Sequence, residues 1–553
     1  MRAARAVSAA SLLALVAVTA RAAAPPRLSA SQQLSDGNKK ERLEWFRDLG
    51  FGMFVHWSVD SQIGSVISHS LVGADPAYVR RFFDLQKTFN PRQYHPEDWA
   101  VLAKLAGMKY VVFTAKHHSG FCMYDTKTTG FGIMGTPYAK DVSAELVKAF
   151  RAQGIAVGFY FSPDDFHWLH ENGKTIDRDP RPGVTPQENP KLLEYDQAQL
   201  RELLTKYGPI DILFIDGPAV GLRELAWKLQ PDIVVTRGAI ETPEQKVRGV
   251  PLDRAWESCI TMGTAWQYKP AHESYKSSTE VLELLIETRA KGGNLLMNVG
   301  PKPNGELPIE QEERLRAIGL WNIAFGESID AVRPWVVSNE GDIWLTKHKT
   351  ADTVYAFVTK TGGWRMGDRR KLTLRSVRAT EATKVSVLGE TGEVLEYRPD
   401  VDPRPAWHQD EAGLHLEVTL AQRFYDNRQW PEPVALKITN VTAALRPPVV
   451  ETGDAVRTAA APTKAVLHAV LKDLGQAPSV EVSFEYRRKK RGEELYEKDE
   501  PWKATPPVTQ KAPGPLEAPI DGLMPDEAYE FRPAVKHPLL TVYGDEKLAP
   551  APR

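Results

Sequence analysis

The alternation of strand-like and helix-like segments over residues 40–330 constrains the fold of this chain most strongly. Short runs rich in β-branched and aromatic residues are typical of buried strands, and longer segments with helical periodicity separate them. The predicted strands cover residues 51–57, 109–115, 155–161, 210–215, 233–236 and 294–299. Because strands that alternate with helices form parallel sheets, we predict an α/β fold with a (β/α)8-like barrel.

The predicted helices fit between these strands, and several are followed at once by a glycine, the residue that most often ends a helix. They cover residues 42–49, 77–85, 98–106, 142–153, 190–206, 222–229, 279–291 and 308–325. A doubly wound open sheet is the alternative architecture. However, no glycine-rich dinucleotide fingerprint follows the first predicted strand, which favours the barrel.

The pattern changes beyond residue 330, where short strands separated by turns predict an antiparallel β-sandwich. Residues 451–463, rich in Ala, Thr and Pro, indicate a linker, and strand patterns then resume. Gly522-Leu523 and Tyr529-Glu530-Phe531 resemble the end of a fibronectin type III module. The predicted units are a barrel over 25–332, a sandwich over 333–450, and a linker with a small β module over 451–553.

The first residues follow the basic, apolar and small-residue order of a secretory signal peptide. Arg2 and Arg5 precede an apolar run, Ala9 to Ala20, and small residues follow it. The run is too short to span a membrane comfortably. We therefore predict a signal peptide over residues 1–24 and a secreted or periplasmic protein.

The charge balance excludes some partners. The formal net charge is −1, so nothing indicates nucleic acid or an anionic membrane surface as a partner. The chain has only two cysteines, Cys122 and Cys259, both in apolar surroundings, and we predict two buried thiols rather than a disulfide. The oligomeric state is left open.

Polar and ring-bearing residues gather where the predicted strands end. They are His56, Trp57, His117, His118, Tyr160, Asp216 and Arg237. In a barrel the carboxyl ends of all strands meet on one face, so these side chains are expected to share a pocket. His117 and His118 are adjacent, and no H-E-x-x-H or H-x-H pattern occurs, so we predict no metal and no cofactor. Histidine and tryptophan side chains instead suit the hydroxyls and faces of a sugar.

Hydrolysis of a glycosidic bond needs two carboxyl groups beside the anomeric carbon. Asp216, at the end of its strand, suits the nucleophile in a retaining mechanism. The second group is open at this point, with Glu241 and Glu244 in the loop after Arg237, and Glu257 beyond it, as candidates.

Several motifs occur in order over residues 42–330, about half of the chain. They are Phe51-Gly52-Met53-Phe54-Val55-His56-Trp57, Lys116-His117-His118-Ser119-Gly120-Phe121, Gly158-Phe159-Tyr160-Phe161-Ser162, Asp211-Ile212-Leu213-Phe214-Ile215-Asp216-Gly217, Trp256-Glu257-Ser258-Cys259 and Lys291-Gly292-Gly293-Asn294-Leu295-Leu296. In these motifs the chain resembles the α-L-fucosidases of glycoside hydrolase family 29.

The resemblance implies an exo-acting, retaining hydrolase that releases terminal α-L-fucose from glycans without a metal. It implies that Asp216 is the nucleophile. It also implies that residues at the other strand ends bind the sugar, namely His56, His117, His118, Tyr160 and Arg237. From its own place at a strand end, we expect Trp57 to join them. The stretch Thr242-Pro243-Glu244 looks most like the family's acid/base loop, so Glu244 is our first candidate, Glu257 the second and Glu241 the third. If Glu257 is not the acid/base, we expect it to contact the sugar.

Two departures from the family pattern concern the sugar pocket. Many members carry a Glu-Trp pair where this chain has Ile67-Ser68-His69-Ser70-Leu71, and we predict that His69 takes over a sugar contact. Phe214 stands where a tryptophan is common. Two alternatives therefore stay open: a glycosidase for a related sugar such as α-L-galactose, and a non-catalytic sugar-binding protein.

Overall fold

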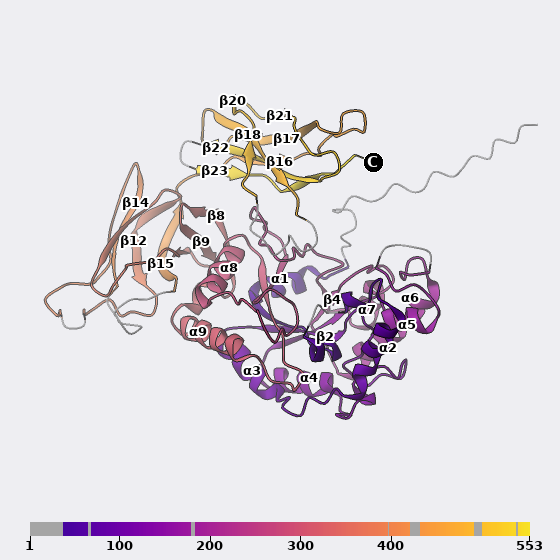
Figure 1. Cartoon of the computed structure of the whole chain (residues 1–553). Helices are drawn as coiled ribbons and strands as arrows, with labels where there is room; N and C mark the ends of the chain where they lie inside the picture. The colour runs from indigo at the N-terminus through magenta and orange to yellow at the C-terminus, as the bar shows by residue number, and fades with distance from the viewer. Residues whose placement is uncertain are drawn as a thin grey trace, which may run out of the picture.

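The computed structural model describes residues 37–64, 68–178, 183–395, 398–420, 432–490, 500–537 and 540–552. Figure 1 shows the helices gathered in the first half of the chain and two strand-rich regions after it. The predicted signal peptide, residues 1–24, lies outside the described residues.

Seven strands of the first region form one sheet in the order β5-β4-β3-β2-β1-β7-β6. Every neighbouring pair in it is parallel. The strands are β1 (Phe51–Val55), β2 (Tyr110–Lys116), β3 (Ala156–Phe161), β4 (Ile212–Ile215), β5 (Val234–Val235), β6 (Glu257–Thr261) and β7 (Asn294–Val299). The predicted α/β fold with a (β/α)8-like barrel is confirmed.

The stretch after β5 takes part in the wall of the barrel beside β6. Glu241 forms a parallel bridge with Trp256, and Glu244 forms one with Cys259. The backbone nitrogens of Glu257 and Cys259 donate to the carbonyls of Glu241 and Pro243, both at 3.1 Å. The stretch from 241 to 245 therefore runs alongside β6 and holds Glu244 opposite Cys259, the middle residue of that strand.

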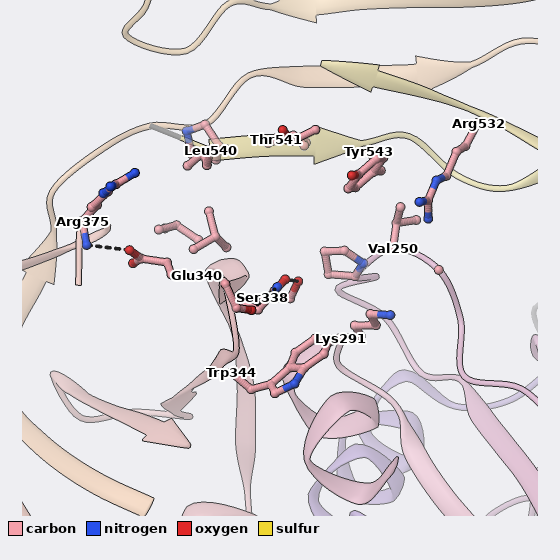
Figure 2. Close-up of a pocket in the computed structure, with 18 of the residues that line it drawn as sticks. Val250, Lys291, Ser338, Glu340, Trp344, Arg375, Arg532, Leu540, Thr541 and Tyr543 are labelled. Carbon is pink, nitrogen blue, oxygen red and sulfur yellow. Dashed lines mark hydrogen bonds between the residues drawn. The ribbon is translucent and has the colours of Figure 1, made fainter. Parts of the chain in front are cut away.

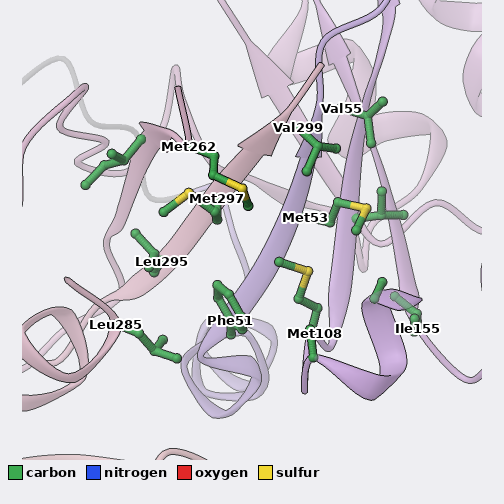
Figure 3. Close-up of a cluster of buried hydrophobic side chains, with 14 of the residues drawn as sticks. Phe51, Met53, Val55, Met108, Ile155, Met262, Leu285, Leu295, Met297 and Val299 are labelled. Carbon is green, nitrogen blue, oxygen red and sulfur yellow. The ribbon is translucent and has the colours of Figure 1, made fainter. Parts of the chain in front are cut away.

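Each barrel strand contributes side chains to two hydrophobic clusters, one on each side of the sheet, because successive side chains point to opposite faces. Phe51, Met53 and Val55 of β1 belong to the cluster between the sheet and the helices, where Met297 of β7 also lies (Figure 3). Phe54, between them, belongs to a second cluster inside the barrel. The pocket described below lies on this inner side, at the carboxyl ends of the strands.

The helices pack outside the sheet. They are α1 (Lys40–Leu49), α2 (Pro76–Asp84), α3 (Pro96–Leu105), α4 (Val142–Ala152), α5 (Phe166–Glu171), α6 (Pro190–Lys206), α7 (Arg223–Leu229), α8 (Ser278–Ala290) and α9 (Ile309–Phe325). The sequence analysis predicted neither the six-residue helix α5 nor the strand β6. Both elements are too short to show a clear period.

Two antiparallel sheets follow the barrel and face one another. One has the order β12-β15-β10-β9-β8 and the other β11-β14-β13. The strands are β8 (Val332–Glu340), β9 (Ile343–His348), β10 (Thr353–Val358), β11 (Arg369–Leu374), β12 (Val377–Val387), β13 (Ala406–Asp410), β14 (Gly413–Thr419) and β15 (Val434–Ala443).

The remaining strands form two further antiparallel sheets with a hydrophobic core of their own. They are β16 (Val449–Thr452), β17 (Ala465–Asp473), β18 (Val480–Arg488), β19 (Lys503–Ala504), β20 (Val508–Gln510), β21 (Gly514–Ile520), β22 (Tyr529–His537), β23 (Leu540–Tyr543) and β24 (Lys547–Ala549). We call the described residues from 449 onward the C-terminal module. Because β16 pairs with β17, this module begins just before the predicted linker.

Cys122 and Cys259 are both free and buried, which confirms the prediction of two buried thiols. Within the described part of the chain, the helices lack the combination of length and hydropathy that a membrane crossing requires.

Candidate active site

A cavity of about 140 Å³ lies at the carboxyl ends of the barrel strands. It is lined by Phe54, His56, His69, His117, His118, Tyr160, Arg178, Phe214, Asp216, Arg237, Glu244, Cys259 and Trp266. The structure thus brings most of the predicted site residues together, from segments far apart in the sequence. The cavity suits a single sugar ring rather than a longer chain.

Asp216 follows β4 directly and is held by three neighbours. Its backbone nitrogen donates to the carbonyl of Phe161 at 3.1 Å. The Tyr160 hydroxyl donates to Oδ2 at 2.7 Å, and Arg237 Nη1 donates to Oδ1 at 2.9 Å. Burial alone would raise the pKa of Asp216, but the Arg237 charge and the Tyr160 hydrogen bond help to hold it well below its usual range. Asp216 is therefore ionised at neutral pH.

Glu244 is joined to Asp216 through Arg237. Arg237 Nη2 donates to Glu244 Oε2 at 2.9 Å, while Nη1 of the same guanidinium holds Asp216. One planar cation therefore places two carboxylates beside each other. The Glu244 side chain is 39% exposed and the Asp216 side chain 20%, so Glu244 stands nearer the mouth of the cavity.

His56 is oriented by Asn298, a residue that sequence reasoning did not single out. His56 Nδ1 lies 2.6 Å from Asn298 Oδ1, and Asn298 Nδ2 donates to the carbonyl of Trp266 at 2.6 Å. The amide oxygen accepts, so Nδ1 carries the proton and Nε2 is left as an acceptor. Burial lowers the pKa of His56 to about 3, which keeps the ring neutral.

His117 and His118 are also neutral, because burial lowers the pKa of each well below its ordinary value. His118 Nδ1 contacts Ser162 Oγ, which itself donates to the carbonyl of Asp164 at 3.0 Å. The serine hydroxyl must therefore accept from Nδ1, leaving Nε2 without a proton, 3.6 Å from Asp216 Oδ2. A sugar hydroxyl could donate to His118 Nε2 at this point.

His69 lies in the cavity wall, as predicted from its place in the sequence. Its ring stacks on His118 with centroids 5.5 Å apart and planes 19° apart. His69 Nε2 is 3.2 Å from Arg178 Nη1, and Arg178 Nε donates to Asp164 Oδ2 at 3.2 Å. Sequence reasoning missed Arg178 because it follows no strand and belongs to no motif.

Trp266 was also missed. Its ring lies 4.8 Å from that of His56 and 5.8 Å from that of Phe54, between centroids. Together with Phe54 and Phe214 it forms an aromatic wall of the cavity. Trp266 comes shortly after β6, so recognising that strand would have placed it among the strand-end residues.

Three predicted candidates lie away from the cavity lining. Trp57 is fully buried against Tyr94 and Trp99 in the outer core. Glu257 begins β6 inside the barrel, where the Tyr110 hydroxyl donates to its Oε2 at 2.6 Å. Burial raises the pKa of Glu257 to about 7. Glu241 turns to Arg248, whose Nε donates to Oε1 at 2.8 Å. The sugar-contact and acid/base roles suggested for these three residues gain no support from their positions.

His117, His118 and Asp216 offer potential metal-ligand atoms within 4.8 Å of one another. Both Asp216 oxygens already accept hydrogen bonds, and the Arg237 cation lies beside them. Because a second cation here would meet that positive charge, the arrangement favours hydrogen bonding to a neutral ligand over metal binding.

Comparisons with known proteins show which family this chain belongs to. The family model for α-L-fucosidase matches residues 17–327. The tissue α-L-fucosidase of Rattus norvegicus is 31% identical over 394 residues, which cover 63% of this chain and 82% of that protein. That of Homo sapiens is 30% identical over 403 residues, which cover 65% of this chain and 83% of that protein.

A solved structure, the α-L-fucosidase isoenzyme 1 of Paenibacillus thiaminolyticus, has a TM-score of 0.59 at 27% identity. The match covers 72% of this chain and 98% of that chain. Because the family model spans more than half of the sequence, including all the cavity residues, this chain belongs to the α-L-fucosidases of glycoside hydrolase family 29.

Proposed function

We propose that this protein is an exo-acting, retaining α-L-fucosidase in which Asp216 is the nucleophile and Glu244 the general acid/base. The observation that carries the proposal is the Asp216–Arg237–Glu244 arrangement at the end of β4. Two carboxylates bonded to one guanidinium lie close together, as a retaining mechanism requires. An inverting mechanism needs them farther apart, with room for a water molecule.

In the first step, an Asp216 oxygen attacks the anomeric carbon of fucose while Glu244 gives a proton to the departing glycosidic oxygen. This step forms a glycosyl ester on Asp216 and releases the rest of the glycan. In the second step, Glu244 takes a proton from water, which attacks the same carbon and frees Asp216. The low pKa of Asp216 supports its part, because only the carboxylate can attack.

The cavity supports recognition of fucose in particular. L-Fucose carries a methyl group where L-galactose carries a hydroxymethyl group, and the wall of Phe54, Phe214 and Trp266 suits a methyl group. A hydroxyl against these rings would lose its hydrogen bonds to water. Apolar pockets reject an added hydroxyl by no more than about 10²-fold, so some α-L-galactosidase activity is expected.

The test is hydrolysis of para-nitrophenyl α-L-fucoside by the purified protein, beside the α-L-galactoside and the β-galactoside. We expect the fucoside to be cleaved fastest, the α-L-galactoside more slowly and the β-galactoside not at all. Proton NMR can show which anomer of fucose is released first. Initial release of the α-anomer would support retention. Equal cleavage of the two α-L-sugars would contradict the role given to the aromatic wall.

We further propose that the protein is exported to the periplasm or beyond the cell. The support is the basic, apolar and small-residue order of residues 1–24. Mass spectrometry of the protein from its native host should show a new N-terminus near residue 25, and an intact residue 1 would contradict export by this route.

A further inference from the structure

The loop that carries Glu244 turns sharply at the next residue, Gln245. Gln245 has a φ of +57°, a left-handed conformation that non-glycine residues adopt only when other contacts fix it. Its Oε1 accepts from the Thr261 backbone nitrogen at 3.2 Å and from the Thr261 hydroxyl at 3.1 Å. Ser258 of β6 donates to the carbonyl of Lys246 at 2.7 Å, and from there the side chains of Lys246 and Arg248 reach the C-terminal module.

The C-terminal module meets this loop through two ion pairs. Lys246 Nζ lies 2.6 Å from Glu530 Oε1, at the start of β22. Arg248 Nη2 lies 2.7 Å from Asp545 Oδ1, between β23 and β24. The loop and the module are nearly 300 residues apart in the sequence, with separations of 284 and 297 at the two contacts. Both contacts occur within four residues of Glu244.

Arg248 ties the two ends of the loop to each other as well as to the module. Its side chain is only 9% exposed, and its Nε donates to Glu241 Oε1 at 2.8 Å. Its Nη1 donates to the carbonyl of Val250 at 3.0 Å. Glu241 precedes Glu244 by three residues, so a single guanidinium fixes the loop on both sides of the acid/base candidate.

The Glu546 side chain of the module covers the backbone at Gly249. A Cβ atom at this position would lie 1.9 Å from Glu546 Oε1 and 2.5 Å from Glu546 Cδ, so a larger residue would require the Glu546 side chain to move. Next to Gly249, a crevice of about 610 Å³ separates the barrel and the sandwich from the C-terminal module. Figure 2 shows Val250 on one side of it and Tyr543 and Arg532 on the other.

We infer that the C-terminal module positions the general acid/base, with Lys246, Arg248, Glu530 and Asp545 as positioning residues. The inference rests on the proposed function of Glu244. Glu244 stands on a loop that is bonded to the barrel along β6 and through Arg237, and proton transfer tolerates little displacement of the donor. The module supplies a further support on the outer side of the loop, so the loop stays in place while the glycan enters and leaves.

The experiment compares two fucosides in the full-length protein. The 2,4-dinitrophenyl group leaves without a proton, whereas the methyl group needs one, so only the methyl fucoside reports the position of the acid. The test variant is E530Q/D545N, which removes both carboxylates of the contact. The control variant is E481Q/D521N, because these carboxylates pair with Lys536 and Lys464 inside the module.

We expect E530Q/D545N to lower kcat/KM for the methyl fucoside by about 10-fold and that for the dinitrophenyl fucoside by less than about 2-fold. The first loss is smaller than the roughly 10²–10⁴-fold that a general acid contributes, because the acid is displaced rather than removed. The control should change neither. K246M, at a side chain 42% exposed, should show the same selective loss and is tolerated by the fold even if the double variant is not.

Unchanged kcat/KM for the methyl fucoside in both K246M and E530Q/D545N would overturn the inference, as would equal losses on the two substrates, which would indicate general damage. E244Q, measured in parallel, separates this outcome from failure of the proposed function. If E244Q lacks the selective loss, then Glu244 is not the acid; if E244Q shows it and the module variants do not, then only the positioning role fails.

Discussion

Arg237 Nη1 lies 2.9 Å from Asp216 Oδ1, and this contact fixes the nucleophile candidate while the other end of the same guanidinium reaches Glu244. A lysine has one ammonium group and cannot bond both carboxylates in this geometry. The charge, the spacing of the two carboxylates and the ionisation of Asp216 therefore depend on one side chain.

Arg237→Lys should lower kcat/KM on para-nitrophenyl α-L-fucoside by about 10²-fold, through loss of one charge-assisted hydrogen bond and of the fixed carboxylate spacing. Because Arg237 lowers the pKa of Asp216, the acidic limb of the pH profile of kcat/KM should move to higher pH in this variant. An acidic limb at the wild-type pH would show that Arg237 does not control the ionisation of Asp216.

Asp216→Ala should lower kcat by at least about 10³-fold while the melting temperature stays near that of the wild type, because the residue supplies the attacking oxygen. Added azide should restore cleavage of the dinitrophenyl fucoside and yield the β-L-fucosyl azide, whose configuration NMR can determine. Residual activity near the wild-type level would refute the assignment of the nucleophile.

Glu244→Gln should lower kcat/KM for methyl α-L-fucoside by about 10²–10⁴-fold and leave that for the dinitrophenyl fucoside within a few-fold. The glutamine keeps the size of the side chain and its contact to Arg237 but has no proton to give. Glu241→Gln is the comparison for the third candidate. Because that carboxylate lies outside the cavity lining and is bonded to Arg248, it only helps to hold the loop, and its selective loss should not exceed about 10-fold. A loss in Glu241→Gln as large as that expected for Glu244→Gln would reassign the acid.

Glu257→Gln should change stability rather than substrate binding. The pKa of Glu257 is about 7 in the folded protein because of burial, against 4.5 ordinarily. Between these values the folded state keeps a proton that the unfolded state loses, so the free energy of unfolding falls as the pH rises from 4.5 to 7, by up to about 3 kcal/mol. The variant lacks this decline. The free energy of unfolding in urea, taken as variant minus wild type, should therefore be more favourable to the variant at pH 8 than at pH 5.

The same variant tests the sugar-contact role that the sequence suggested for Glu257. Its KM should stay within about 2-fold of the wild type, because Glu257 does not line the cavity. A large rise in KM together with an unchanged pH dependence of stability would restore that role.

Trp266→Ala should raise KM for the fucoside by about 10-fold, equivalent to about 1.4 kcal/mol, through loss of the aromatic wall. Trp266→Phe keeps a ring beside His56 and should recover most of the loss. Equal KM values in the wild type and the alanine variant would place the sugar elsewhere in the cavity.

The sequence by itself determined the alternating barrel and the residues at the ends of its clear strands. Buried strands such as 210–215 have a local pattern of apolar residues, and the residue that follows such a strand lies at a sheet edge whatever the rest of the chain does. Asp216, His117, His118 and Tyr160 were found for this reason, and the structure places all four in the cavity.

Only the tertiary structure decided which carboxylate joins Asp216. The sequence ranked Glu244 ahead of Glu257 and Glu241 only by its resemblance to the family's loop. In the structure Arg237 lies opposite Glu244, Arg248 opposite Glu241 and Tyr110 opposite Glu257. The same holds for Trp266 and Arg178, which reach the cavity from loops, and for the contact between Arg248 and Asp545. These pairings depend on how distant segments pack, and no period or motif within one segment encodes them.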